Sequence, residues 1–241
     1  MTWIEAVFLI IIFLSNVIQT ITGFAGTALA MPFSLLILEE TVVKPVLNIV
    51  ALGVCLFIVI RHFKDIDWKE ALWMALFISI GFAGGILVGL LPHDGTIFLR
   101  VYGGVIIAVA LLFLFIHPEK HNVPTWVLLI CLVLGGFVHA LYISGGPLVV
   151  IFAMLKIKDK HKFRATLSFI WIIFNSALLI EHGIQGLLTP HVGLLAGIGL
   201  AATVVSIVIG QFLAKRMPKN AFMIATNILL LISGVLLVIP H

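Results

Sequence analysis

The sequence carries very little charge. Of its 241 residues, only 10% are Asp, Glu, Lys or Arg and 62% are hydrophobic, whereas a soluble domain is about half apolar and a quarter charged. No polar stretch is long enough to form a separate soluble domain. Apolar runs of about 20 residues, each sufficient to cross a bilayer, recur along the chain. This composition excludes a water-soluble fold and predicts an all-α polytopic membrane protein embedded in the lipid bilayer.

Cysteines and basic residues are also scarce. The two cysteines, Cys55 and Cys131, lie within apolar runs and far from any metal-ligand spacing, so we expect no disulfide, metal site or cofactor. The net charge is +4, but Lys and Arg gather in short loops, where they report membrane orientation rather than nucleic-acid binding. The first apolar run contains Glu5 in place of the basic start of a signal peptide. We therefore interpret that run as mature structure.

The apolar runs follow one pattern twice, in which a long broken run precedes three unbroken spans. The breaks carry glycine, at Thr22–Thr27 and at Tyr142–Pro147. The first repeat, 1–121, comprises the broken run 3–38 and the spans 42–60, 68–91 and 97–116. The second repeat, 122–241, comprises the broken run 124–155 and the spans 163–180, 192–214 and 221–239.

Loop charges predict how these segments cross the membrane. Three loops, around Lys64, Lys158 and Arg216, are basic and are assigned to the cytoplasm by the positive-inside rule. Counting crossings between the first two loops requires the run 124–155 to begin and end on the cytoplasmic side. That run is too short for two full crossings of about 20 residues each. We therefore predict a re-entrant hairpin in each half, two inverted repeats and both termini outside.

The backbone at each break predicts an anion site. Unpaired N–H groups in lipid cost several kcal/mol each, so the breaks must be buried or hydrated. The return arms, Ala28–Leu38 and Pro147–Lys156, are roughly 15 Å long at 1.5 Å per residue, which places their starts near the midplane. Helix N-termini carry free N–H groups and the positive end of the dipole. Two such ends brought together would bind an anion without any Lys or Arg, and neither residue type occurs in the span interiors.

The candidate substrate-binding residues surround the two breaks. We expect the glycines to permit unusual backbone angles and close approach by a ligand, and the polar side chains to donate to anionic oxygens. His139 either titrates near neutral pH, coupling transport to protons, or is a hydrogen-bonded interior histidine. The candidates are Gln19, Thr20, Thr22, Gly23, Phe24, Ala25, Gly26 and Thr27 at the first break, and His139, Tyr142, Ser144, Gly145, Gly146 and Pro147 at the second.

Other small and polar residues within the spans have two possible roles. The series Gly81, Gly85 and Gly89 is typical of a close-packing helix face. The helix-embedded polar residues either hydrogen-bond between helices or line a path, and the sequence leaves both open. They are Asn48, Ser168, Asn175 and Asn227.

Together these residues resemble the TauE/SafE sulfite exporter family, whose two halves each begin with a broken apolar segment of the type G-x-G-G-G-x(4)-P. The first copy reads Gly23-Phe24-Ala25-Gly26-Thr27, with Pro32 in place. The second reads Tyr142-Ile143-Ser144-Gly145-Gly146, with Pro147 directly after it and Ile151 where the proline would stand. The resemblance covers essentially the whole chain. It implies a carrier in the bacterial inner membrane, driven by ions or by the membrane potential, for small sulfur-containing anions such as sulfite, thiosulfate or organosulfonates.

We therefore predict a secondary transporter, most simply an exporter, that binds its anion between the two re-entrant tips. An anion channel is one alternative, distinguished by flux that does not saturate. An intramembrane lipid-phosphate hydrolase is another, but it would need a positioned nucleophile or an acid/base group, commonly with Arg. We expect no enzymatic activity. The anion, the coupling ion and the choice between monomer and homodimer are left open.

Overall fold

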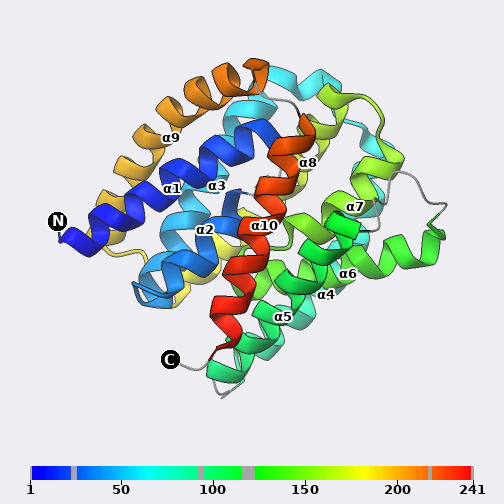
Figure 1. Cartoon of the computed structure of the whole chain (residues 1–241). Coiled ribbons are helices and arrows are strands. Elements are labelled where there is room, and N and C mark those ends of the chain that lie inside the picture. The colour runs from blue at the N-terminus through cyan, green and yellow to red at the C-terminus, as the bar shows by residue number, and fades with distance from the viewer. Residues whose placement is uncertain (1, 23–25, 92–94, 116–122, 217–218, 240–241) are drawn as a thin grey trace.

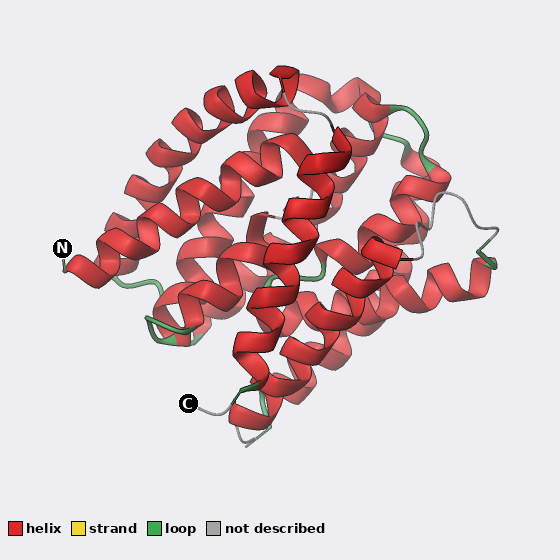
Figure 2. Cartoon of the chain, viewed as in Figure 1, coloured by secondary structure: helices red, strands yellow, loops and turns green. Residues whose placement is uncertain are grey.

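The computed structural model describes the chain except residues 1, 23–25, 92–94, 116–122, 217–218 and 240–241. Every regular element in the described residues is helical (Figure 2). The helices are α1 (Trp3–Thr22), α2 (Gly26–Leu35), α3 (Glu40–His62), the 3-10 helix η1 (Phe63–Asp65), α4 (Trp68–Gly89), α5 (Gly95–Phe115), α6 (Thr125–Tyr142), α7 (Gly146–Lys156), α8 (Lys160–Ile184), α9 (Pro190–Arg216) and α10 (Lys219–Val238).

The helix lengths separate full spans from half-spans. Among the described residues, six helices are long and apolar enough to cross a membrane, namely α1, α3, α4, α6, α8 and α9. The return arms α2 and α7 have 10 and 11 residues, as the sequence predicts. Their partners α1 and α6 have 20 and 18 residues, so each hairpin joins a long arm to a short one. The predicted polytopic helical fold is confirmed. The predicted spans fall on the helices α3, α4, α5, α8, α9 and α10, of which α5 and α10 are not among the six long apolar helices of the described residues.

Helix pairs from the two halves of the chain pack in matched sets. Helix α4 packs on α6, and α9 packs on α1; likewise α3 contacts α9, and α8 contacts α4. The pairs α3 with α8 and α5 with α10 complete the arrangement, with α5 and α10 side by side in Figure 1. Each of these contacts thus has a counterpart when the halves are exchanged, whereas the contact of α2 with α10 has no counterpart of comparable extent between α7 and α5 in the described residues.

Glycines allow the closest of these contacts. A Cβ atom at Gly81 in α4 would collide with the carbonyl of Val133 in α6, and one at Gly136 in α6 would collide with the carbonyl of Ile78. A Cβ at Gly85 would lie 2.7 Å from the Ala140 methyl. Because helix association in lipid depends on such close backbone approach, this face joins the two halves of the chain. The close-packing role predicted for Gly81 and Gly85 is confirmed.

The basic loop that follows α3 and the basic loop that precedes α8 lie side by side. The backbone N–H of Asp67 donates to the Thr166 hydroxyl at 2.9 Å, and Trp68 packs edge-on against Phe169 at 5.1 Å. At the other end of the bundle, the His191 ring lies 3.1 Å from a Glu5 carboxylate oxygen, joining the starts of α1 and α9.

Candidate functional site

The second break is a sharp interruption between two buried helices. Helix α6 ends at Tyr142, and the N–H of Ile143 closes it by donating to the carbonyl of His139 at 2.8 Å. Helix α7 begins at Gly146, with Pro147 in its first turn, where the missing N–H costs nothing. The predicted break is confirmed at the predicted residues.

The strained residue of this break is an isoleucine. Ile143 has φ 55° and ψ 21°, the left-handed conformation, and its side chain is buried. That conformation costs about 1–2 kcal/mol for a residue with a Cβ, and a β-branched side chain is rarely found in it. Gly145, by contrast, has an ordinary right-handed helical φ of −67°. The expectation that the glycines supply the unusual angles is therefore wrong for Gly145.

Gly145 is required for close approach, but by the protein's own backbone. A Cβ atom here would collide with the carbonyl oxygen of Gly135 and would lie 2.8 Å from the His139 Cβ. The start of α7 is thereby pressed against α6. The close approach shown at Gly145 is thus a contact within the hairpin, and a ligand contact there stays a prediction.

The two breaks contact each other. The hydroxyl of Ser144, in the second break, donates to the carbonyl of Thr27, in the first turn of α2, at 3.2 Å. Residues 117 positions apart in the chain are joined by this bond, and α2 and α7 are also in contact. The predicted meeting of the two interruptions is confirmed for the described residues.

A cavity of about 210 Å³, which we call the break cavity, lies beside this contact. Both short helices reach it at their N-terminal ends, through Thr27 and Gly146. Donor and acceptor side chains from several helices also line it. They are Asn16, Gln19 and Thr20 from α1, His139 from α6, Ser168 and Asn175 from α8, and Gln211 from α9.

One end of the break cavity is basic. Arg61 and His62 at the end of α3, and His161 and Arg164 at the start of α8, line it together. The Arg61 guanidinium lies 4.4 Å above the Phe57 ring. The cavity lining therefore lacks Lys and Arg only near the breaks. The cavity as a whole has an electropositive mouth, which raises the local concentration of anions.

His139 is held in a fixed orientation. Its Nε2 lies 3.0 Å from the Asn175 side-chain oxygen, and its ring stacks on Trp171 with centroids 4.5 Å apart. Because the amide oxygen only accepts, Nε2 carries the hydrogen and Nδ1 holds a lone pair. Nδ1 is buried and has no hydrogen-bond partner among the residues that the structure describes. The neutral imidazole thus keeps one free acceptor, which becomes a donor on protonation.

A second cavity, of about 310 Å³, is reached from the other side of the second break. We call it the Tyr142 cavity. Its charged residues are Glu40 and Lys44 from the start of α3 and Glu181 from the end of α8, beside His182. Because the break cavity involves the opposite ends of these two helices, the two cavities open toward opposite ends of the bundle.

Tyr142 belongs to this second cavity. Its ring stacks on Tyr102 of α5, with centroids 4.2 Å apart, and lies under the Lys44 ammonium at 5.0 Å. Lys44 also pairs with Glu40. The expectation that Tyr142 shares one site with Gln19, Thr27 and His139 is corrected: it lies at the opposite cavity.

The other predicted residues have varied positions. Gly26 lies against the Gln19 side chain, which a Cβ atom would displace. Pro147 is buried at the start of α7. Thr22 ends α1, but its side chain and the residues Gly23, Phe24 and Ala25 lie outside the described residues.

Both interpretations of the helix-embedded polar residues apply. Asn48 donates to the Asn175 carbonyl at 3.0 Å, which joins α3 to α8, whereas Ser168 and Asn175 line the break cavity. The break cavity is also lined by Asn16, Trp171 and Gln211, which no sequence pattern indicated. Arg61 near the end of α3 and Arg164 in the first turns of α8 line the break cavity as well, whereas the sequence pattern related the basic loops only to membrane orientation.

The fold and cavities define a multi-pass integral membrane protein of the transporter type. A profile of the family described as sulfite exporter TauE/SafE matches residues 8–237, so the chain belongs to this family. Export-type transport of an anion is accordingly the activity of its class. No curated protein and no solved structure matches the chain in comparable searches.

Proposed function

We propose that this protein is a secondary transporter that exports a small sulfur-containing anion, such as sulfite, thiosulfate or an organosulfonate. The anion binds in the break cavity, between the N-terminal ends of α2 and α7. The observation that carries the proposal is the Ser144–Thr27 hydrogen bond beside a cavity that both short helices reach. Two helix N-termini directed at one space favour negative charge there.

The chemistry of the site suits an anion that must be released again. Near the breaks, the groups able to donate are backbone N–H groups and the neutral amides of Gln19 and Asn16. One Asn16 amide hydrogen already bonds the Ile12 carbonyl, and the Thr20 hydroxyl donates to the Asn16 carbonyl at 2.8 Å, so Thr20 offers the anion no donor. The fixed charges of Arg61 and Arg164 lie at the mouth, where they attract the anion without holding it at the centre. Binding is thus favourable enough for selection and weak enough for turnover.

The two cavities supply the two access routes. Tyr142 faces one and Ile143 faces the other, so neighbouring residues of one break separate them. Opening the Tyr142 cavity to the site requires movement of the Tyr142–Tyr102 pair and of the strained Ile143. Alternating access around a broken helix is how transporters with repeated halves commonly work.

We further propose the orientation predicted from the loops, with the basic mouth in the cytoplasm, both termini outside, and the repeats 1–121 and 122–241 inverted in the bacterial inner membrane. The matched helix pairs and the adjacency of the α3–α4 and α7–α8 loops support it. A 20-residue helix is about 30 Å long and a 10-residue helix about 15 Å. Both ends of each hairpin therefore reach one face only if the long arm is inclined, and Figure 1 shows α1 running obliquely to α10.

Exit of an anion needs little further driving force. An inside-negative membrane potential favours it by about 2.3 kcal/mol per charge per 100 mV. His139 offers a site for a coupled proton: protonation at Nδ1 would turn the free acceptor in the break cavity into a donor for the anion. We propose that His139 couples proton and anion binding in this way.

The test is a flux screen in proteoliposomes. Sulfite, thiosulfate, organosulfonates and carboxylates are offered with and without a pH gradient and a potential. We expect saturable flux of at least one sulfur anion, and flux of none would overturn the proposal. Flux that grows linearly with concentration would favour a channel instead.

Two sets of variants sharpen the screen. His139→Gln keeps a side chain able to hydrogen-bond Asn175 but cannot titrate, so we expect flux that no longer responds to the pH gradient. An unchanged response would remove His139 from the coupling. For orientation, Lys64→Cys and Lys158→Cys in a cysteine-free background should be labelled from the cytoplasm, and Gly186→Cys from outside.

A further inference from the structure

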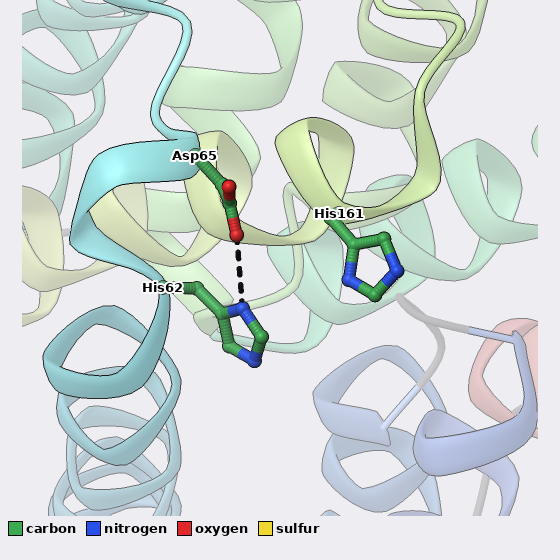
Figure 3. A group of neighbouring side chains, drawn as sticks. All are labelled: His62, Asp65 and His161. Atoms are coloured by element: carbon green, nitrogen blue, oxygen red, sulfur yellow. Dashed lines mark hydrogen bonds and ion pairs between the residues drawn. The ribbon is translucent and has the colours of Figure 1, made fainter.

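Three metal-ligating side chains converge at the mouth of the break cavity. His62 from the end of α3, Asp65 from η1 and His161 from the first turn of α8 offer ligand atoms that all lie within 4.8 Å of one another (Figure 3). The ring centroids of His62 and His161 are 5.8 Å apart. The basic mouth of the break cavity does not explain why an aspartate lies beside the two histidines.

Local structure holds each ligand in place. Asp159 caps α8, accepting from the backbone N–H groups of His161 and Lys162 at 2.9 Å each. The N–H of Lys162 is the main reason that the pKa of the Asp159 carboxyl lies below its usual value, with the N–H of His161 adding to it. The bond from Asp67 to Thr166 ties η1 to the same helix. The cluster therefore lies between two anchored segments.

We propose that His62, Asp65 and His161 bind a divalent transition-metal cation such as Zn²⁺ or Ni²⁺. Imidazole nitrogens with one carboxylate suit these metals better than they suit Mg²⁺ or Ca²⁺. The Asp65 carboxylate already lies 3.0 Å from His62 Nδ1, so a cation can replace this contact and be bound by both groups. His161, which is exposed, can rotate to bring its nitrogen closer.

The surroundings make this a reversible site rather than a structural one. His62 and Asp65 are 43% and 42% exposed, and Lys64, Arg61 and the basic residues around His161 repel a dication. Three protein ligands leave the remaining coordination positions to water. The fold does not depend on the metal.

A metal bound at the mouth of the break cavity would affect transport. His62 and His161 both line the break cavity, so a bound cation would tether the end of α3 to the start of α8 at the mouth. Alternating access requires that mouth to change shape, and the tether opposes the change. We therefore expect the metal to inhibit flux; this step rests on the proposed function, whereas metal binding does not.

The binding test uses the full-length protein purified through a tag that contains no histidine. Isothermal titration calorimetry with ZnCl₂ and with NiCl₂ should show one site. His161→Ala and His62→Ala should each abolish it. Asp65→Asn should weaken it by about tenfold or more, because the neutral amide is a poorer ligand for a dication than the carboxylate. Because all three positions are partly or fully exposed, thermal unfolding without metal should match the wild type.

Matched controls locate the site. His191→Ala changes a histidine at the opposite end of the bundle, and His117→Ala with His121→Ala removes histidines outside the described residues. Both controls should bind like the wild type. Loss of binding in either control, retention in His161→Ala, or no binding by the wild type would overturn the proposal.

A transport arm tests the tether. Zn²⁺ on the side of the basic loops should reduce flux at least several-fold, EDTA should restore it, and His161→Ala should be insensitive. Zn²⁺ that binds yet leaves flux unchanged would overturn the tether. If no anion is transported at all, the proposed function fails while the calorimetry still decides the metal site.

Discussion

In both breaks a long helix is followed by a short one, but different contacts hold the two short helices in place. In the second break, a buried left-handed Ile143 turns the chain, and Gly145 lies directly on the backbone of α6. In the first, Gly26 lies against a side chain, that of Gln19, which also lines the break cavity. A backbone contact cannot yield, whereas the end of the glutamine side chain can rotate away, although its Cβ atom, 2.9 Å from the added Cβ, cannot. The second break is thus the rigid partner and the first the adjustable one.

The largest effect is expected at the rigid break. Gly145→Leu should abolish flux, because even its Cβ atom collides with the carbonyl of Gly135 and forces α7 away from α6. Flux in proteoliposomes and the amount of protein in the membrane are both measured. Gly104→Ala is the matched control, since a Cβ there meets no atom within 4 Å. Normal flux in Gly145→Leu would count heavily against the proposal that the anion binds between the two breaks.

At the adjustable break, a substitution should be milder and partly reversible. Gly26→Ala should lower flux by a smaller factor, because the added methyl displaces the Gln19 side chain. Shortening that side chain in Gly26→Ala with Gln19→Ala should restore the protein's thermal stability in part. No recovery would place the obstacle elsewhere. Flux in the double variant would also show whether Gln19 contributes to anion binding.

The strain at Ile143 predicts an inverted order of stability. Ile143→Ala keeps the Cβ atom in the left-handed conformation and loses the buried side chain, at about 2–5 kcal/mol. Ile143→Gly loses slightly more surface but relieves the strain, worth about 1–2 kcal/mol. Glycine should therefore be the more stable substitution in thermal unfolding in detergent. The ordinary order, with alanine more stable, would refute the strained turn.

The smallest effect is expected where the two breaks meet. Ser144→Ala removes the hydrogen bond to the Thr27 carbonyl, and such bonds between membrane helices average about 0.6 kcal/mol. We expect a small drop in stability and a changed affinity for the anion, measured as the half-saturation concentration of flux. An unchanged half-saturation would show that the contact between the breaks does not shape the site.

Much of this arrangement could be predicted from the lengths of the apolar runs and from the glycines and prolines that interrupt them. The ends of α6 and α7 follow from Tyr142, the glycines and Pro147, and the packing face from Gly81 and Gly85. The left-handed Ile143 could not be anticipated, since neighbouring glycines offered an easier position for the turn. Tyr142 was grouped with His139 because the two are close in sequence, yet the turn of the break directs them to different cavities.

The sequence by itself determined the helices, their breaks and the location in a membrane. The length of an apolar run and the residues that interrupt a helix act locally, so neither depends on the tertiary structure. Only the tertiary structure decided which side chains share a space. Packing of α3 on α8 brings Arg61, His62, His161 and Arg164 to one mouth, and the contact of α2 with α7 brings Thr27 to Ser144. Such neighbours, about a hundred residues apart in the chain, meet only because helices associate through shape, and no local pattern encodes that shape.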